Sequence, residues 1–515
     1  MGLSELEKKR LENIRRNKEL LQNLQLDSLK NEIDASAKSK KQKSTSGPTK
    51  IKKEPVEPTR RSRRLAGIKF ALENPDEFEK QRKEEEEIRK KEQEARRKRL
   101  IGDFKISELI PGSGHEENSE EDNRVLDLMK SLGDKFSAGD FYDLIREKSS
   151  GENTTLEKQR KEFDKLNIYE RFDPLDIKIA EKRITSIAFH PAKEDRIVTA
   201  GDTEGNVGLW LVDGKSYDDA PSITMLRPHG KNISRLVFPT FSPEKLFSSS
   251  YDGSIRSLDL TKQVSTEVLF LSDPDDGSVL GVSHFEQVDK ILYMTTLSGE
   301  FCQQDPRERT RTRSGNRDYL RLHDKKIGGF AVNPNNTHQI ATSSLDRSLR
   351  IWDLRKVGSS VYSEYEEQKS PELYGSYSSR LSISCASWNS ENRIVCNGYD
   401  DNIALFDLNQ QPNVMKVEPP ELPNNLTPIK KIRHNCQTGR WVSILKSSWQ
   451  SNPADGFQKF IIANMNRGLD IFDQEGNIIA HLNESVGAVP AVSTLHPTQN
   501  WAVGGSASGK VYLFE

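Results

Sequence analysis

Seven copies of one pattern run from about residue 175 to residue 515, and no other feature restricts the possible folds as strongly. Each copy holds a strand-like run, a second run about ten residues later, a turn, and a third run ending in a bulky residue. The closing positions are Trp210, Leu258, Gln304, Trp352, Phe406, Phe472 and Phe514. Their spacing ranges from 42 residues (Phe472 to Phe514) to 66 residues (Phe406 to Phe472). We therefore predict an all-β, seven-bladed β-propeller over residues 171–515.

The seventh copy ends with its third run, so the outer strand of that blade must come from another part of the chain. DIKIAEK, residues 176–182, directly precedes the first copy and is the natural donor. With this strand in place the ring is closed and the sheet edge is covered. We expect trimming of residues 170–182 to destabilise the whole propeller.

The stretch IWDLR, residues 351–355, is the Trp-Asp motif of a large propeller family. On this motif and the sevenfold repeat, the chain resembles the WD-repeat family over residues 175–515, although the Gly-His dipeptide of that family is mostly absent. The resemblance implies the same propeller fold.

Residues 1–170 hold almost nothing that predicts a sheet. Only 34% of the chain is hydrophobic and 30% is charged, and a region that cannot bury enough apolar surface stays disordered. We expect a largely disordered, partly helical charged region. A short amphipathic helix is predicted at residues 3–26, and a solvated, mixed-charge helix that contacts little is predicted at residues 77–100.

Two basic clusters lie in this region, at residues 38–43 (KSKKQK) and 59–64 (TRRSRR). Clustered cations are recognised by nuclear-import receptors and displace counterions from nucleic-acid phosphates. We expect nuclear localisation and extra DNA affinity from this tail, and the alternative is a merely solvated segment. The cations concerned are Lys40, Lys41, Arg60, Arg61, Arg63 and Arg64.

Signatures of catalysis and of metal binding are missing from the sequence. It has no GxSxG elbow, P-loop or HExxH motif. GGSASGK (504–510) reads as a glycine turn between strands, and Asp252, Asp346 and Asp400 read as turn residues. The four cysteines form no CxxC pair, and no apolar run approaches the roughly 18 residues of a membrane span. We expect no enzyme activity, cofactor, metal, membrane or small-molecule substrate.

Cations recur directly before the first strand of the blades, and these positions share one face of the ring, around the channel. Five of the seven blades carry them, which should focus a positive potential suited to a polyanion. We predict a DNA-binding face, against the alternative of independently solvated loop residues. Its cations are Lys182, Arg183, Lys231, Lys325, Lys326, Arg380 and Arg440.

Several stretches are similar to the fungal "changed mutation rate" family, nuclear WD-repeat proteins grouped with the small subunit of the UV-damaged-DNA-binding complex. They are AGDTEGNVGLW (200–210), SYDGSIRSLDL (250–260), HDKKI (323–327) and HNCQTGRWVSILK (434–446). The resemblance implies binding of single- and double-stranded DNA with a preference for UV damage. It also implies that Lys182 and Lys326 occupy phosphate-contacting positions.

The loop HNCQTGRW, residues 434–441, matches the place where the damage-binding relatives carry an aromatic wedge. Its tip here is Asn435, Cys436 and Gln437, so lesion-specific insertion lacks its apolar residue. We expect Gln437 and Arg440 to face DNA. We expect Trp441 to anchor the strand WVSILKSSW (441–449) rather than to stack on a base.

A different function is predicted by WDLR, residues 352–355. It is similar to the box by which some WD proteins dock onto the adaptor of a cullin-type ubiquitin ligase, with Asp353 and Arg355 as the matching residues. In this alternative the propeller is a scaffold or substrate receptor that binds protein, such as histones in chromatin, and DNA contact is incidental.

Overall fold

The structure is a computed structural model, and it describes residues 83, 87, 90, 94, 99–109, 156–214, 220–305, 307, 318–365, 367–410, 421–439 and 441–515. The basic clusters at 38–43 and 59–64, the helix predicted at 3–26 and Arg440 lie outside the described residues. The elements discussed below belong to one compact unit, Glu86–Glu515.

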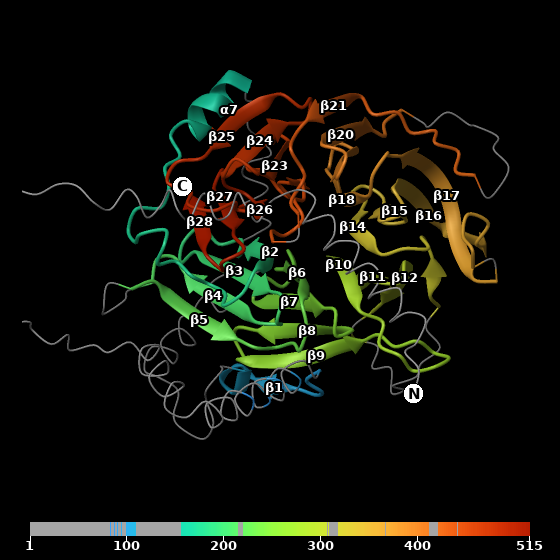
Figure 1. Ribbon diagram of the computed structural model, residues 1–515, viewed down its shortest axis with the longest axis horizontal. Coiled ribbons are helices and arrows are strands. Elements are labelled where there is room, and N and C mark those ends of the chain that lie inside the picture. The colour runs from blue at the N-terminus through green and yellow to red at the C-terminus, as the bar shows by residue number, and fades with distance from the viewer. Residues whose placement is uncertain are drawn as a thin grey trace, which may run out of the picture. The chain divides into compact units, whose positions relative to one another are not determined.

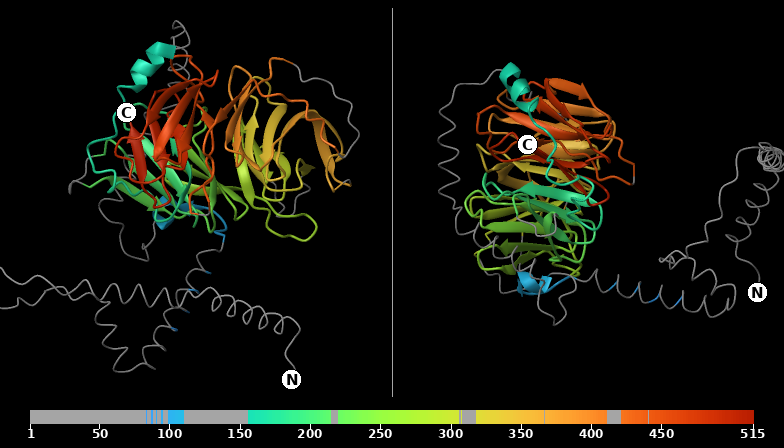
Figure 2. Two further views of the ribbon diagram at one scale, coloured as in Figure 1. Left: turned by 45° about the horizontal axis from the view of Figure 1, so that its top comes forward. Right: turned by 90° about the vertical axis from the view of Figure 1, so that its left-hand side faces the viewer.

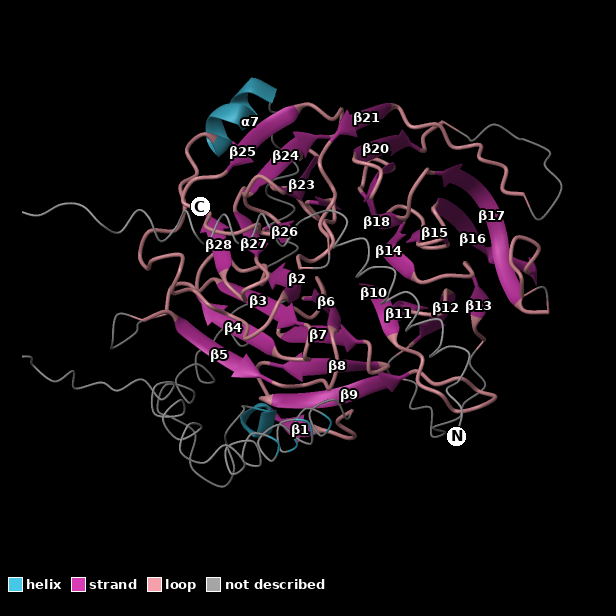
Figure 3. Ribbon diagram, viewed as in Figure 1, coloured by secondary structure: helices cyan, strands magenta, loops and turns pink. Residues whose placement is uncertain are grey.

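Seven antiparallel sheets are arranged in a ring, which confirms the predicted propeller (Figures 1 and 3). Blades one to three contain β2 (Ile184–Phe189), β3 (Ile197–Asp202), β4 (Val207–Leu211), β5 (Ser222–Leu226); β6 (Ile233–Val237), β7 (Lys245–Ser250), β8 (Ser254–Asp259), β9 (Val264–Phe270); and β10 (Val282–Val288), β11 (Ile291–Thr296), β12 (Glu300–Gln304), β13 (Leu320–Arg321). Blades four and five contain β14 (Ile327–Val332), β15 (Gln339–Ser344), β16 (Ser348–Ser359), β17 (Lys369–Ser378); and β18 (Ile383–Trp388), β19 (Arg393–Gly398), β20 (Asn402–Asp407), β21 (Lys430–Arg433). Blades six and seven contain β22 (Ser448–Trp449), β23 (Lys459–Asn464), β24 (Gly468–Asp473), β25 (Ile478–Leu482); and β26 (Val492–Leu495), β27 (Ala502–Gly505), β28 (Val511–Phe514).

The innermost strand of each blade contacts the innermost strand of the next, and β26 of blade seven contacts β2 of blade one. The second strands are almost wholly buried, as in β3 and β15, because both of their faces pack against neighbouring blades. Blades one and seven share one apolar cluster that includes Ile184, Trp210 and Leu513. Burial of apolar surface between the blades is what holds the ring together.

Blade seven is closed by residues that precede blade one, as the sequence predicted. The backbone N–H of Tyr169 donates to the carbonyl of Leu513 at 2.8 Å, and that of Ala180 donates to Gly509 at 3.1 Å. The closing segment differs from the prediction in one respect. It pairs at two places, around residues 167–169 and 177–180, so it begins before residue 170.

Two segments of the charged region pack on the propeller, and this corrects the expectation that the run ending at residue 100 contacts little. β1 (Phe104–Lys105) adds a fifth strand to blade two beside β9, and η1 (Ile106–Leu109) follows it (Figure 2). Arg99 makes an ion pair with Glu267 at 3.1 Å. The fully buried guanidinium of Arg256 donates to the carbonyl of Gly102 at 2.6 Å.

A third segment of this region, α7 (Leu156–Phe163), packs on blade six (Figure 2). Phe163 is buried in the apolar cluster of that blade, and Arg160 donates to the carbonyl of Ile478 at 2.9 Å. The folded unit therefore includes residues N-terminal to the expected boundary at 171.

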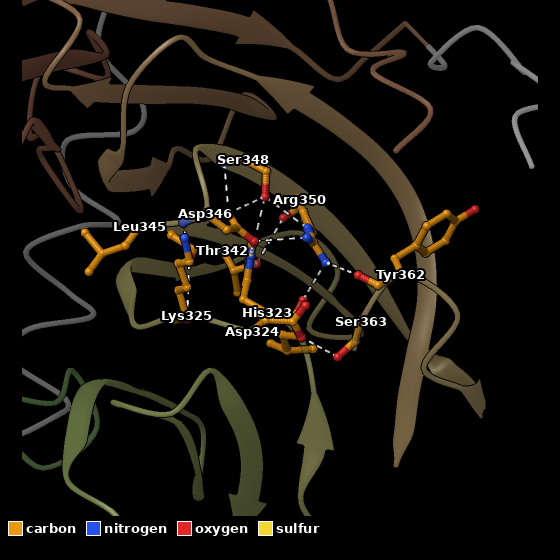
Figure 4. A network of polar contacts seen from close by, with 12 residues as sticks. His323, Asp324, Lys325, Thr342, Leu345, Asp346, Ser348, Arg350, Tyr362 and Ser363 are labelled. Atoms are coloured by element: carbon orange, nitrogen blue, oxygen red, sulfur yellow. Dashed lines mark hydrogen bonds and ion pairs between the residues drawn. The ribbon is translucent and has the colours of Figure 1, made fainter. Parts of the chain in front are cut away.

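An acid in the turn between the second and third strands of blade four was predicted only to stabilise that turn, but it also takes part in a side-chain hydrogen-bond network. Asp346 accepts the turn N–H of Ser348 at 2.9 Å and also contacts Nδ1 of His323 at 2.7 Å (Figure 4). His323 Nε2 reaches Thr342 at 2.7 Å, and Thr342 accepts from the indole of Trp352 at 2.8 Å. Burial raises the pKa of Asp346, but His323 and Arg350 outweigh this effect and hold the pKa well below its usual range.

Candidate functional site

The starts of the innermost strands meet on one side of the ring, which we call the front face. Thr185, Ile233, Gly328 and Ser384 line one cavity of about 390 Å³ at the mouth of the channel there. The turns between second and third strands share this side, because Ile327 at the start of β14 pairs with Ser344 at the end of β15. The other side is the back face.

Four of the predicted cations are exposed on the front face: Lys182, Lys231, Lys325 and Arg380, which we call the front cations. Among the described residues, Lys231, Lys325 and Arg380 make no ion pair, and Lys182 lies 3.9 Å from Glu204. Exposed pairs at such distances are worth little. All four side chains are therefore available to an outside anion.

Cations on the back face are arranged differently. Arg196 pairs with Asp213 at 2.7 Å, Arg393 pairs with Glu475 at 2.7 Å, and Arg355 pairs with its neighbour Asp353 at 2.6 Å. Hydrogen bonds from Arg355 hold the pKa of Asp353 down to about 2. These three arginines are thus neutralised by carboxylates, unlike Lys231, Lys325 and Arg380 on the front face.

The front cations form an arc rather than a closed ring. The loop before blade three carries Asp275 and Asp276, both exposed, and the loop before blade seven carries exposed Glu484. Blades four, five, one and two supply the described cations, and blade three separates them with negative charge. A polyanion on this face would follow the arc and avoid the acidic loop.

Two of the predicted cations lie at the mouth of the channel. Arg183 and Lys326 line the mouth cavity together with Tyr251 and Tyr399. Lys326 donates to the Tyr251 hydroxyl at 2.6 Å, and its ammonium lies 4.6 Å from the centre of that ring. This contact orients the Lys326 charge across the opening.

The segment before blade six does not form the predicted strand. In WVSILKSSW only Ser448–Trp449 pairs as β22, and residues 442–447 run along the channel without joining a sheet. Asn397 of blade five donates to the carbonyl of Leu445 at 2.8 Å, and Ser443 donates to the carbonyl of Ile184 in blade one at 2.5 Å. The segment is therefore a bridge across the mouth, held from two blades.

The loop 434–439 is tied to the neighbouring turn of blade five. Cys436 N–H donates to Asp401 at 3.0 Å, Gln437 donates to the carbonyl of Tyr399, and His434 contacts Asp470 at 3.1 Å. Gln437 itself is exposed on the front face. The loop tip is thus held in place, with its amide already bonded within the chain.

Trp441 corrects the prediction most clearly. It was expected to anchor a strand, but its side chain is 87% exposed and is the most exposed of the large hydrophobic residues on the described part of the chain. It lies between the tied loop and the bridge, next to the mouth of the channel. An indole this exposed at the mouth of the channel is a ready surface for stacking.

Sequence reasoning missed two cations inside the channel. Lys446 lies on the bridge and lines the mouth cavity, and Arg235 on β6 lines the cavity behind it. Burial, reinforced by Lys326 and Arg235 and opposed by Cys385, lowers the pKa of Lys446 to about 8. Arg235 lies in the middle of a strand-like run. The only sequence signal for it was the alternation of side chains along a strand, which allows every second residue to face the channel.

Other chemistry finds little support within the described ranges. No cluster of three or more His, Cys, Asp or Glu side chains there could hold a metal ion. The four cysteines, all within that part, are buried and form no disulfide with one another. None of the described helices is both long and apolar enough to cross a bilayer.

Comparisons with known proteins identify relatives over the whole chain. A family model described as "WD domain, G-beta repeat" matches residues 317–353. The chain is 55% identical to the DNA damage-binding protein CMR1 of Candida albicans, over 100% of both chains. It is 55% identical to the protein of the same name from Scheffersomyces stipitis, over 100% of this chain and 99% of the relative. It is 38% identical to that of Yarrowia lipolytica, over 100% of both.

Proposed function

The chain belongs to the family of fungal DNA damage-binding proteins CMR1, and from this premise we propose that it binds DNA through the front face of its propeller. It is a WD-repeat protein related to DNA damage, and its fold and its relatives' names point to binding rather than catalysis. We propose that it acts in the nucleus, where its DNA would be.

One observation carries the proposal: Lys231, Lys325 and Arg380 are exposed on the front face and make no ion pair with a described residue, whereas Arg196, Arg355 and Arg393 on the back face are each paired with a carboxylate. Unpaired cations are free to displace counterions from phosphates, which is the main source of sequence-independent affinity. Lys231, Lys325 and Arg380 would contact phosphates along the arc. Lys326, fixed by Tyr251, would do so at the mouth.

The exposed indole of Trp441 supports a preference for bases that have lost their stacking partners. Base–aromatic stacking is tolerant of sequence, and a damaged or single-stranded base is the least costly to expose. We propose that single-stranded and UV-damaged DNA bind more tightly than intact duplex for this reason. Gln437 would contact the backbone beside it, and Arg440 is proposed to add a further phosphate contact.

The test is binding of the full chain to a single strand, an intact duplex and a UV-irradiated duplex of the same sequence. Fluorescence anisotropy over about 50 to 200 mM salt should show affinity falling steeply with salt for all three. The irradiated duplex should bind more tightly than the intact one. Affinity that is absent, or that does not change with salt, would contradict binding through the cationic arc.

A second function is favoured by the back face of blade four. Arg355 is 59% exposed beside a cavity of about 440 Å³, and Val357 and Val361 nearby are each 47% exposed. Exposed apolar side chains around a cavity are typical of protein docking sites. We propose that Asp353 and Arg355 contact a protein partner, either a cullin-type ligase adaptor or a chromatin component such as a histone.

The two proposed functions can be separated because they use opposite faces. Arg355→Ala should remove binding of a purified adaptor or histone complex and leave DNA affinity unchanged. A matched substitution of the exposed Lys193, Lys193→Ala, controls for loss of charge on the back face away from this cavity. Retention of the partner by Arg355→Ala would argue against docking at this site.

A further inference from the structure

Behind the mouth, the channel contains an inner cavity of about 200 Å³ to which all seven blades contribute. It shares Thr185, Ser234, Ile444 and Lys446 with the mouth cavity, so the two are continuous. Its walls are rich in hydroxyl groups as well as cations. Buried polar groups normally have a hydrogen-bond partner, so the partners of these groups are informative.

Four buried polar atoms on this wall lack a hydrogen-bond partner within the described part of the chain. They are Nε of Arg235, Nδ1 of His284, Oγ of Ser448 and Oγ of Ser493. His284 is only 5% exposed. Buried polar groups left without partners are costly, and several around one cavity indicate a missing hydrogen-bonding species.

The charge of the cavity is also uncompensated. Lys446 makes no ion pair or hydrogen bond with any described residue. Arg235 lies 3.5 Å from Glu286, which is the single acid among the described residues that line the two cavities. With Lys326 at the mouth, three cations lie beside this one carboxylate.

The neighbouring titratable groups do not neutralise this charge. Burial raises the pKa of the Cys385 thiol, which donates to the carbonyl of Ser447 at 2.8 Å and stays neutral. Burial also holds the pKa of His284 well below its usual range. Burial lowers the pKa of Lys446 only to about 8, so its ammonium is mostly charged at neutral pH. An unpaired buried charge is destabilising unless a counter-ion reaches it.

We propose that the inner cavity is a binding site for a phosphate group, held by the Lys446 ammonium and the Arg235 guanidinium. Ser448 and Ser493 donate to its oxygens, and one tautomer of His284 donates a further hydrogen bond. The inner cavity suits a phosphate with little attached to it, and the mouth cavity leaves room for the rest of a nucleotide. The phosphate comes either from a free anion or from the terminal phosphate of a DNA strand that enters through the mouth.

The site is separate from the front cations and does not depend on the proposed DNA contact. The test titrates inorganic phosphate into the full chain by calorimetry at pH 7, with ionic strength held constant by sodium chloride. Lys446→Met keeps the side-chain volume and removes a half-buried charge, so it should fold at least as well as the parent. Loss of a charged hydrogen bond should weaken phosphate binding about 10- to 100-fold.

Lys231→Met on the front face is the matched control and should leave phosphate affinity unchanged. Ser493→Ala, which removes one hydroxyl, should weaken binding a few-fold and provides a second variant if Lys446→Met is unstable. Absence of phosphate binding to the parent chain, together with equal affinity for the two strands described below, overturns the proposal. Equal phosphate affinity in the parent and both channel variants overturns it as well.

Two short DNA strands that differ only in a 5′-phosphate or 5′-hydroxyl end distinguish the two sources. If the strand end is the ligand, the phosphorylated strand binds more tightly, and Lys446→Met removes the difference while neutralised front cations weaken both strands alike. If the free anion is the ligand, the strands bind equally and inorganic phosphate still binds the parent chain. Either result supports the site, and a difference that persists in Lys446→Met refutes it.

Discussion

Neutralising three front cations should change the salt dependence of DNA binding by a calculable amount. The variant carries Lys231→Gln, Lys325→Gln and Arg380→Gln, which are three front cations that make no ion pair with a described residue. Each phosphate contact on duplex DNA contributes about 0.9 to the slope of log affinity against log salt. Loss of three contacts should reduce the slope by about 2.7. If the parent and the variant bind equally at about 1 M salt, the variant should therefore bind roughly 500-fold more weakly than the parent at about 0.1 M.

The assay is fluorescence anisotropy with a duplex of about 20 base pairs over a salt series. Because the three side chains are exposed, the free energy of unfolding should change by less than about 0.5 kcal/mol for each. The control carries Lys193→Gln, Lys262→Gln and Lys356→Gln on the back face, which changes the net charge by the same amount. An unchanged slope in the front variant, or an equal loss in the control, would refute the assignment of DNA to the front face.

Further outcomes follow from individual contacts. Trp441→Ala should weaken single-strand binding by about 1 to 3 kcal/mol without changing the melting temperature, because the indole is 87% exposed; Trp441→Phe should restore most of the affinity. The pKa of Asp346 is depressed in the folded state, so its charge stabilises the fold above the ordinary aspartate pKa near 4 and this stability is lost as pH falls through the folded value. Urea unfolding should therefore show the gap between the parent and Asp346→Asn narrowing below about pH 4. Arg256→Met should lower the melting temperature through loss of the bonds to Leu100 and Gly102, and protease cleavage should then reach residues 99–109. Deletion of residues 167–180 should abolish cooperative thermal unfolding, and retention of a sharp transition would argue against closure by this segment.

The ring of blades could be predicted from the sequence because each blade repeats the same local order of strands and turns. Closure by residues near 176–182 followed from the missing outer strand. Addition of β1 to blade two could not be predicted, because FK is too short to show a strand period and its pairing depends on Arg256, more than 150 residues away. The pattern of neighbouring residues in the sequence does not indicate partners that are so distant in the chain.

The candidate site shows the same division. Positions before the first strands indicated which cations share a face, and the structure places Lys182, Lys231, Lys325 and Arg380 there in exposed positions. Whether these cations have acidic partners could not be predicted from the sequence, because the partners would come from loops that are distant in the chain and adjacent only in the fold. Trp441 was misjudged because alternation in WVSILKSSW resembles a strand, whereas Asn397 and Ile184 of other blades hold that segment out of the sheet.

Closure of blade seven has a consequence for the order of events during synthesis. The strand partners of residues 167–169 lie at 513–515, so translation of the whole propeller separates their emergence from the ribosome. Until residues 511–515 appear, the early segment has no sheet to join, and long-range pairings of this kind form slowly. The nascent chain must therefore keep an unpaired edge throughout its synthesis, and a ribosome stalled before residue 511 would release an open ring that is prone to aggregation.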